Sequence, residues 1–146
     1  MIRFSALICL LFVQGCVTQD VAAITQRARF PEYPTTLFDA VEAVCTEPAD
    51  VFHKPDRNTV ECRSYLSPDA TAAVMVMYDG TLDELPQMVL RFTTEPQLPE
   101  YVVEFGAFLN VPRKDGPDVR VVHRDASVNR RMQQVMTSAG GTPEPD

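Results

Sequence analysis

The sequence is poor in the residues that usually carry catalysis or bind metals. It has two histidines, His53 and His123, and no paired metal-ligand motif. His123, Asp125 and Ser127 lie close enough in sequence to suggest a nucleophilic triad, but a triad also needs an oxyanion hole and a substrate cleft. Neither a glycine-rich phosphate loop nor a calcium-binding loop is present. We therefore expect a protein that is not an enzyme and that uses no cofactor or metal.

Basic residues are also scarce, with 13 lysines and arginines against 20 aspartates and glutamates, and a net charge of -7 at pH 7. Nucleic-acid binding requires clustered Lys and Arg, so this balance argues against a nucleic-acid partner. The exception is a basic group near the C-terminus, which contains Arg120, Arg124, Arg130 and Arg131. Either this group is a solvated helix face, or its four arginines dock an acidic partner.

No apolar run is long enough to span a bilayer core, which takes about 20 residues. The first residues instead combine one positive charge, at Arg3, with a ten-residue apolar stretch from Phe4 to Val13. This pattern is typical of a secretory signal peptide.

The stretch ends in the tetrad Val13-Gln14-Gly15-Cys16, which resembles the lipobox of bacterial lipoproteins. The resemblance implies that the chain is cut before Cys16 and that Cys16 becomes the lipid-bearing first residue. Val17 follows it, and in such lipoproteins a residue other than Asp at this place implies sorting to the outer rather than the inner membrane. The alternative is an ordinary signal peptide cut near Gly15, with Cys16 unmodified.

The four cysteines divide by position. Cys9 lies in the apolar part of the signal peptide, and Cys16 carries lipid under the resemblance. Cys45 and Cys62 remain as a pair in an exported chain, which favours a disulfide. Two buried thiols or a metal pair are the alternatives, although two cysteines without a nearby histidine make a poor zinc site.

The first folded element is expected to be a helix. Thr35 or Thr36 can cap its N-terminus, apolar residues then recur at helical spacing, and Pro48 ends it. The following segment, 49–57, contains Pro55 and reads as a loop.

Strands and a second helix follow. Alternating or continuous apolar residues predict strands over 58–66, 72–78, 87–94, 100–109 and 118–123. The last helix is predicted over 127–138, with Asp125 or Ser127 as its cap. Short connections between successive strands favour antiparallel pairing. The predicted fold is therefore α+β, in two layers, with a four- to five-stranded antiparallel sheet whose N- and C-terminal helices lie on one face, a helix-grip-like architecture.

The layout predicts a signal peptide over 1–15, a lipid-anchored tether over 16–34, a single domain over 35–141 and a disordered tail over 142–146. The order of elements is similar to that of α+β modules of lipoproteins in outer-membrane assembly machinery. We expect a lipid-anchored interaction or structural module that faces the periplasm and has an envelope protein as partner. The alternative is a carrier or sensor of a small apolar ligand, bound in a groove between helix and sheet.

Overall fold

The computed structural model describes residues 26–144, so the predicted signal peptide and the lipidation site at Cys16 lie outside the described residues. Within this part the chain has an α+β fold with one open sheet of seven strands and three helices. The strands are β1 (Gln26–Phe30), β2 (Asp50–Asp56), β3 (Thr59–Tyr65), β4 (Gln87–Gln97), β5 (Glu100–Val111), β6 (Val119–Val122) and β7 (Thr142–Pro143). The helices are α1 (Thr35–Val44), α2 (Pro68–Tyr78) and α3 (Ala126–Ser138).

β4 and β5 form the centre of the sheet and are its longest strands, with 11 and 12 residues. The strand order is β2-β3-β4-β5-β1-β7, and all paired strands are antiparallel. One edge of β5 serves two partners, because its first half pairs with β1 and its second half pairs with β6. The sheet thus has seven strands rather than the four or five predicted.

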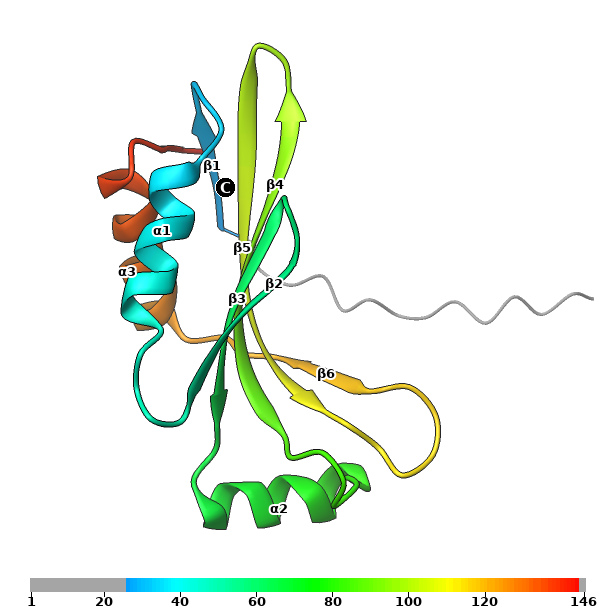
Figure 1. Ribbon diagram of the computed structural model, residues 1–146. Coiled ribbons are helices and arrows are strands. Elements are labelled where there is room, and N and C mark those ends of the chain that lie inside the picture. The colour runs from blue at the N-terminus through cyan, green and yellow to red at the C-terminus, as the bar shows by residue number, and fades with distance from the viewer. Residues whose placement is uncertain (1–25, 145–146) are drawn as a thin grey trace, which may run out of the picture.

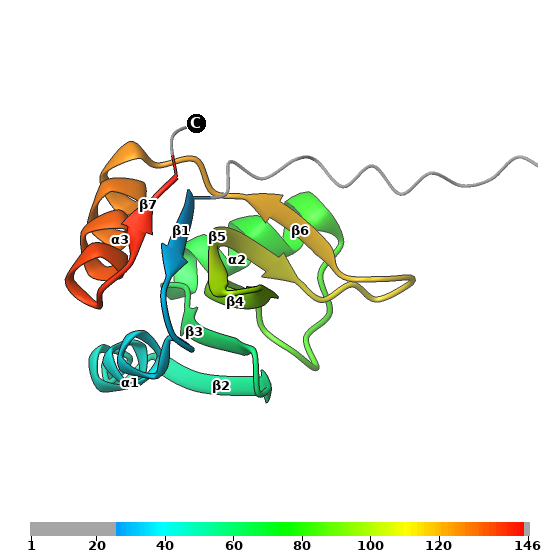
Figure 2. The same cartoon turned by 90° about the horizontal axis from the view of Figure 1, so that it is seen from above.

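The helices divide between one face and one end of the sheet. α1 and α3 lie on one face, and α2 lies across the end of the sheet (Figures 1 and 2). We call the face with α1 and α3 the covered face and the opposite one the uncovered face. The hydrophobic core fills the space between the two helices and the covered face, with Leu37, Phe38 and Val41 from α1 and Met136 from α3.

Alternation along three strands places the predicted face in the core. Val60 and Cys62 of β3, Phe92 of β4, and Val103 and Phe105 of β5 all belong to the core cluster. Phe92 and Phe105 are paired across β4 and β5, and their ring centroids lie 5.1 Å apart. Burying one such side chain contributes about 1.5–3 kcal/mol, so this pair anchors the centre of the sheet.

The segment 72–78 is helical, and the predicted central strand there is wrong. α2 begins with Pro68 at its first turn, followed by Asp69, and continues through an alanine-rich stretch. Proline and an acidic residue both suit a helix N-terminus, and alanine has the highest helix propensity. Asp79 then takes a left-handed conformation, with φ 55°, and ends the helix. A short apolar run does not by itself distinguish strand from helix, and the flanking residues decide it here.

The segment expected as a loop, 49–57, contains strand β2. It pairs with β3 from Asp50 to Asp56, with a register shift between His53 and Asp56. Pro55 lies in this irregular part, at the edge of the sheet, where a missing N–H disrupts no ladder. Phe52 packs against the core and holds the strand in place.

The sheet also extends beyond both predicted ends of the domain. β1 lies in the segment expected as tether, and its residues Ala28 and Phe30 are buried at 0% and 3% exposure. β7 lies in the segment expected as a disordered tail and pairs with β1. Glu144 follows β7, and its carboxylate lies 2.6 Å from Arg29. β1 is short and carries arginines at alternate positions, and β7 has only two residues, so neither strand gives much hydrophobic signal and the sequence pattern missed both.

The helix ends agree with prediction only at α3. Asp125 caps α3, because its carboxylate accepts hydrogen bonds from the backbone N–H groups of Ser127 and Val128. The Ser127 hydroxyl also donates to this carboxylate, and that bond, together with the two backbone bonds, holds the pKa of Asp125 below its ordinary value. α1 differs from prediction: Pro34 occupies the cap position without a side-chain bond, and the helix ends at Val44 rather than Pro48.

Candidate functional site

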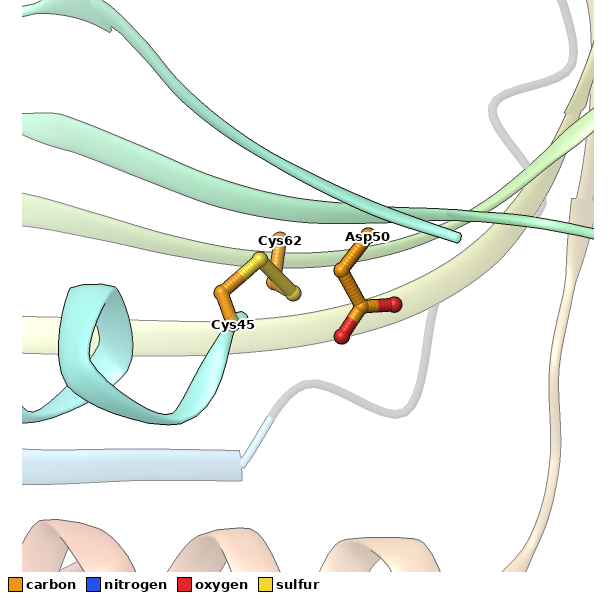
Figure 3. A group of neighbouring side chains, drawn as sticks. All are labelled: Cys45, Asp50 and Cys62. Atoms are coloured by element: carbon orange, nitrogen blue, oxygen red, sulfur yellow. A yellow bond between two sulfur atoms is a disulfide. The ribbon is translucent and has the colours of Figure 1, made fainter. Parts of the chain in front are cut away.

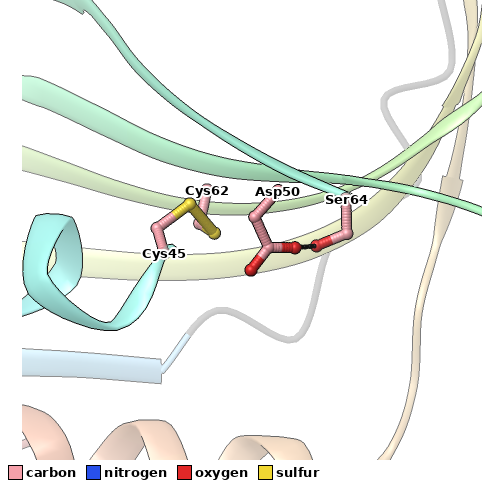
Figure 4. The surroundings of a disulfide bond; sticks show 4 residues. All are labelled: Cys45, Asp50, Cys62 and Ser64. Carbon is pink, nitrogen blue, oxygen red and sulfur yellow. Dashed lines mark hydrogen bonds between the residues drawn. A yellow bond between two sulfur atoms is a disulfide. The ribbon is translucent and has the colours of Figure 1, made fainter. Parts of the chain in front are cut away.

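The predicted disulfide is present between Cys45 and Cys62 (Figure 4). It joins the residue after α1 to the middle of β3, so it fastens a covering helix to the sheet. The two cysteines are 17 residues apart, and cross-linking a loop of this size stabilises a fold by about 3 kcal/mol in the chain-entropy model. Both cysteines are buried, which marks the bond as part of the core.

Asp50 lies beside this disulfide, as Figure 3 shows. One atom each from Cys45, Asp50 and Cys62 lie within 4.8 Å of one another, a grouping that could hold a metal ion. The two sulfur atoms are bonded to each other, however, and zinc is bound by thiolates. The Asp50 carboxylate is also occupied, because it accepts a hydrogen bond from Ser64. In this state the cluster is structural.

The second cluster lies on the uncovered face and is centred on a buried carboxylate. Glu61 of β3 has no exposed surface. Arg63 reaches one of its oxygens, Oε2, with Nη2 at 2.6 Å, and Arg91 of β4 reaches the other, Oε1, with Nη2 at 2.5 Å. His53 of β2 completes the group, with Nδ1 3.4 Å from Oε2.

The charge state of Glu61 follows from these contacts. Burial alone raises the pKa of a carboxyl group, because it disfavours the charged form. Hydrogen bonds and positive charge from Arg63 and Arg91 outweigh this effect, and the pKa of Glu61 falls below its ordinary value. Glu61 is therefore a carboxylate at neutral pH, and it fixes both guanidinium groups on the uncovered face.

The ring of Phe108 lies between Arg91 and a third arginine, Arg120, and so extends this cluster across the sheet. The guanidinium carbon of Arg91 lies 4.9 Å from the centroid of Phe108, and that of Arg120 lies 5.2 Å from the same centroid. Gly106 pairs with Arg91 across β4 and β5, and the space above it is open. We call Glu61, Arg63, Arg91, Phe108 and Arg120 the arginine network. It spans the strands from β3 to β6.

The four arginines predicted to bind a partner do not share one surface. Arg120 lies on β6 and belongs to the arginine network. Arg130 and Arg131 lie on α3, in the layer over the covered face, and Arg124 lies in the connection before α3. All four are exposed, and none forms an ion pair with another described residue.

Sequence reasoning missed Glu61, Arg63 and Arg91. Their signal is a charged residue at alternate positions of two predicted strands, 58–66 and 87–94. Charged residues on the outer face of a strand are common, so this signal gains meaning only when the strands are known to be neighbours. The register supplies that, because it pairs Glu61 with Arg91 directly.

An open hollow of about 470 Å³ lies on the uncovered face, beside the connection between α2 and β4. Its wall combines strand residues with the connection between α2 and β4, and several of its side chains are charged. The lining includes Val51, His53, Arg63, Tyr65, Asp83, Glu84 and Asp118. A second hollow of about 170 Å³ lies between the β1–α1 connection and the end of α3. Ligand pockets usually measure about 300–1,000 Å³ and are mostly apolar, and neither hollow meets both conditions.

α2 and the residues after it expose apolar side chains. Val76 is 87% exposed, Met77 is 70% exposed and Leu82 is 82% exposed. No residue of α2 is buried. A cluster of exposed large apolar residues marks an interaction surface more often than chance.

No known family model, curated protein or solved structure matches this chain. Among the described helices, none has the length and apolar character needed to cross a bilayer.

Proposed function

We propose that this protein is a lipid-anchored, non-enzymatic interaction module of the bacterial cell envelope, facing the periplasm from the outer membrane. The lipobox-like tetrad that ends in Cys16 supports the anchor. The disulfide between Cys45 and Cys62 fits an exported domain, because such bonds persist in oxidising compartments.

The observation that carries the interaction role is the arginine network on the uncovered face. It sets three arginines against one glutamate, so the network itself carries net positive charge in a chain whose net charge is -7. Glu61 holds Arg63 and Arg91 in fixed positions, which lowers the entropy lost when a partner binds them. Arginine and aromatic side chains are also enriched in interface hot spots. The surface therefore suits an envelope protein with exposed carboxylates.

The apolar-ligand alternative finds less support. The space between the helices and the covered face is filled by core side chains such as Phe38, Val60 and Met136. The larger hollow lies on the opposite face and is lined by charged residues. We therefore favour the partner-binding role.

Site-specific photocrosslinking in living cells tests this role. A photoreactive residue at Tyr65, on the uncovered face, should form a discrete protein adduct, whereas one at Gln134, exposed on α3, should not. Arg120→Glu should remove the adduct because it reverses the charge over Phe108. Arg130→Glu is the matched control, since it makes the same change on α3. Adducts formed only from Gln134, or lost equally in both variants, would refute the proposed surface.

A further inference from the structure

α2 is an apolar helix whose side with Val74, Met75 and Tyr78 is half-buried, while its opposite side is exposed. Its sequence contains three alanines, two valines and two methionines, and it carries no basic residue. A helix that is apolar on all sides is normally buried, and this one is not. We call Ala73, Val76 and Met77 the α2 patch, because their spacing places them on one face of the helix. All three are exposed, so the patch is free to contact another surface.

The position of α2 suits contact with a flat surface. The helix lies crosswise at one end of the molecule, while the long strands β4 and β5 run away from it (Figure 1). It is tied to the sheet at its C-terminal end, where Gly80 bridges to Arg113 after β5. Eleven residues of helix are about 16 Å long, so α2 can lie along a surface with the sheet standing above it.

The chain between Cys16 and β1 is long enough for the α2 end of the molecule to reach a membrane in which a lipid on Cys16 is inserted. Gln26 pairs with Phe105, and the end of β5 at Val111 lies six residues further along. At the rise of a β-strand this separation is about 20 Å. Ten residues lead from Cys16 to Gln26, and they can span at most about 35 Å. A lipid on Cys16 and the α2 patch can therefore enter the same bilayer.

We propose that α2 lies in the interface of the anchoring bilayer, with the α2 patch inserted among zwitterionic lipid headgroups. The inference rests on the proposed function, because it takes the lipid on Cys16 as the first membrane contact. A tether raises the local concentration of the patch to about the millimolar range, which makes a weak apolar contact effective. The lipid then anchors the domain and the α2 patch orients it. In this orientation the uncovered face is directed along the membrane plane rather than toward the bilayer.

The acidic residues around α2 favour a zwitterionic bilayer, rather than a second copy of the chain, as the surface that contacts the α2 patch. Asp69 lies in the first turn of α2, and Asp79, Asp83 and Glu84 follow the helix. An antiparallel pair of α2 helices would bring these carboxylates together, which is unfavourable. Anionic lipid would repel them as well. Zwitterionic headgroups, such as phosphatidylethanolamine and phosphatidylcholine, present no net charge.

Tryptophan fluorescence can test the contact, because the chain has no natural tryptophan. Met77→Trp places a probe in the α2 patch, and Val44→Trp is its control at the end of α1, where the native side chain is 71% exposed against 70% for Met77. Each full-length variant is produced with its own leader and reconstituted into phosphatidylethanolamine–phosphatidylcholine vesicles. Brominated phosphatidylcholine should quench Met77→Trp severalfold more strongly than Val44→Trp and shift its emission to shorter wavelength. Adding Val76→Asp should abolish the difference.

The outcomes separate this inference from the proposed function. Equal, weak quenching at both positions overturns the membrane contact, even where mass spectrometry finds lipid on Cys16. Quenching specific to Met77→Trp supports the contact whether or not that lipid is found, whereas a missing lipid refutes the proposed anchor. A dimer in detergent that Val76→Asp makes monomeric would overturn the inference in favour of a second copy. A protein adduct from a photoreactive residue at Met77, without quenching in vesicles, would overturn it in favour of a protein partner.

Discussion

Arg91 and Glu61 face each other on neighbouring strands, 30 residues apart in sequence, and two guanidinium nitrogens of Arg91 lie 2.5 Å from one carboxylate oxygen of Glu61. Arg63 pairs with the other oxygen. A carboxylate without exposed surface is costly unless its oxygens are paired, and here both are. The ion pairs of Glu61 therefore have two effects: they stabilise the sheet, and they fix the positions of Arg63 and Arg91 on the uncovered face.

Glu61→Gln should destabilise the domain. The substitution keeps the size of the side chain but leaves two arginines without their carboxylate, and losing charge-assisted bonds of this kind costs about 1–3 kcal/mol. Urea unfolding should show a lower midpoint with an unchanged slope. Glu104→Gln is the control, since Glu104 pairs with Arg27 while 40% of its side chain is exposed, and it should cost less than about 1 kcal/mol. Equal losses in the two variants would contradict the role assigned to Glu61.

The stabilisation by Glu61 should depend on pH in a defined direction. Its pKa in the folded protein lies below the ordinary value of 4.5. Such a group stabilises the fold fully above its unfolded pKa, and the stabilisation is lost as the pH falls through the folded pKa. The difference in free energy of unfolding between the wild type and Glu61→Gln should therefore shrink as the pH falls below about 4.5. Urea titrations at each pH measure it, and a difference that persists undiminished at the lowest pH where the protein folds would refute the assignment.

Half-buried strands were the part of the fold that the sequence could predict. In β3, β4 and β5 one face packs in the core and the opposite face carries charged residues such as Glu61 and Arg91, so hydrophobicity largely alternates along the chain. α2 defeated the same reasoning, because apolar residues occupy its exposed side as well as its half-buried side, so its hydrophobicity follows no helical period. β1 and β7 are held by backbone pairing and by the contacts of Arg29 with Glu144, which depend on segments distant in sequence.

The candidate site also has one part that the sequence could predict, the disulfide, and one part that it could not, the arginine network. Counting cysteines was enough to predict the Cys45–Cys62 disulfide, because only this pair is left when Cys9 is assigned to a signal peptide and Cys16 to a lipidation site. The arginine network depends on register, since Glu61 meets Arg91 only when β3 and β4 are neighbours with this alignment. Arg120 was selected from the sequence for its charge, but its place over Phe108 comes from the pairing of β5 with β6.

Gly141→Ala should destabilise the junction between α3 and β7. A Cβ at this position would lie 2.6 Å from the ring of Phe30 and 2.9 Å from the carbonyl oxygen of Met136, both in the core region. Overpacking of this kind costs about 1–3 kcal/mol. Gly106→Ala is the matched control, because its Cβ would meet nothing within 4 Å, and alanine there should be neutral or slightly stabilising. Chemical denaturation of both variants measures the difference. Similar stabilities would show that the Phe30 ring shifts to accommodate the added Cβ without cost.

Cys16→Ser should separate anchoring from folding. Cys16 lies outside the described residues and belongs to none of the packing described for 26–144, so we expect the free energy of unfolding to stay unchanged. Without the thiol no lipid can be attached, and the protein should be found as a soluble or unprocessed form that no longer incorporates labelled palmitate. The variant Cys45→Ser with Cys62→Ser is the control: it should keep the lipid and its membrane fraction while losing about 3 kcal/mol of stability. A Cys16→Ser protein that still fractionates as a mature, lipidated membrane protein would show that the lipobox interpretation is wrong.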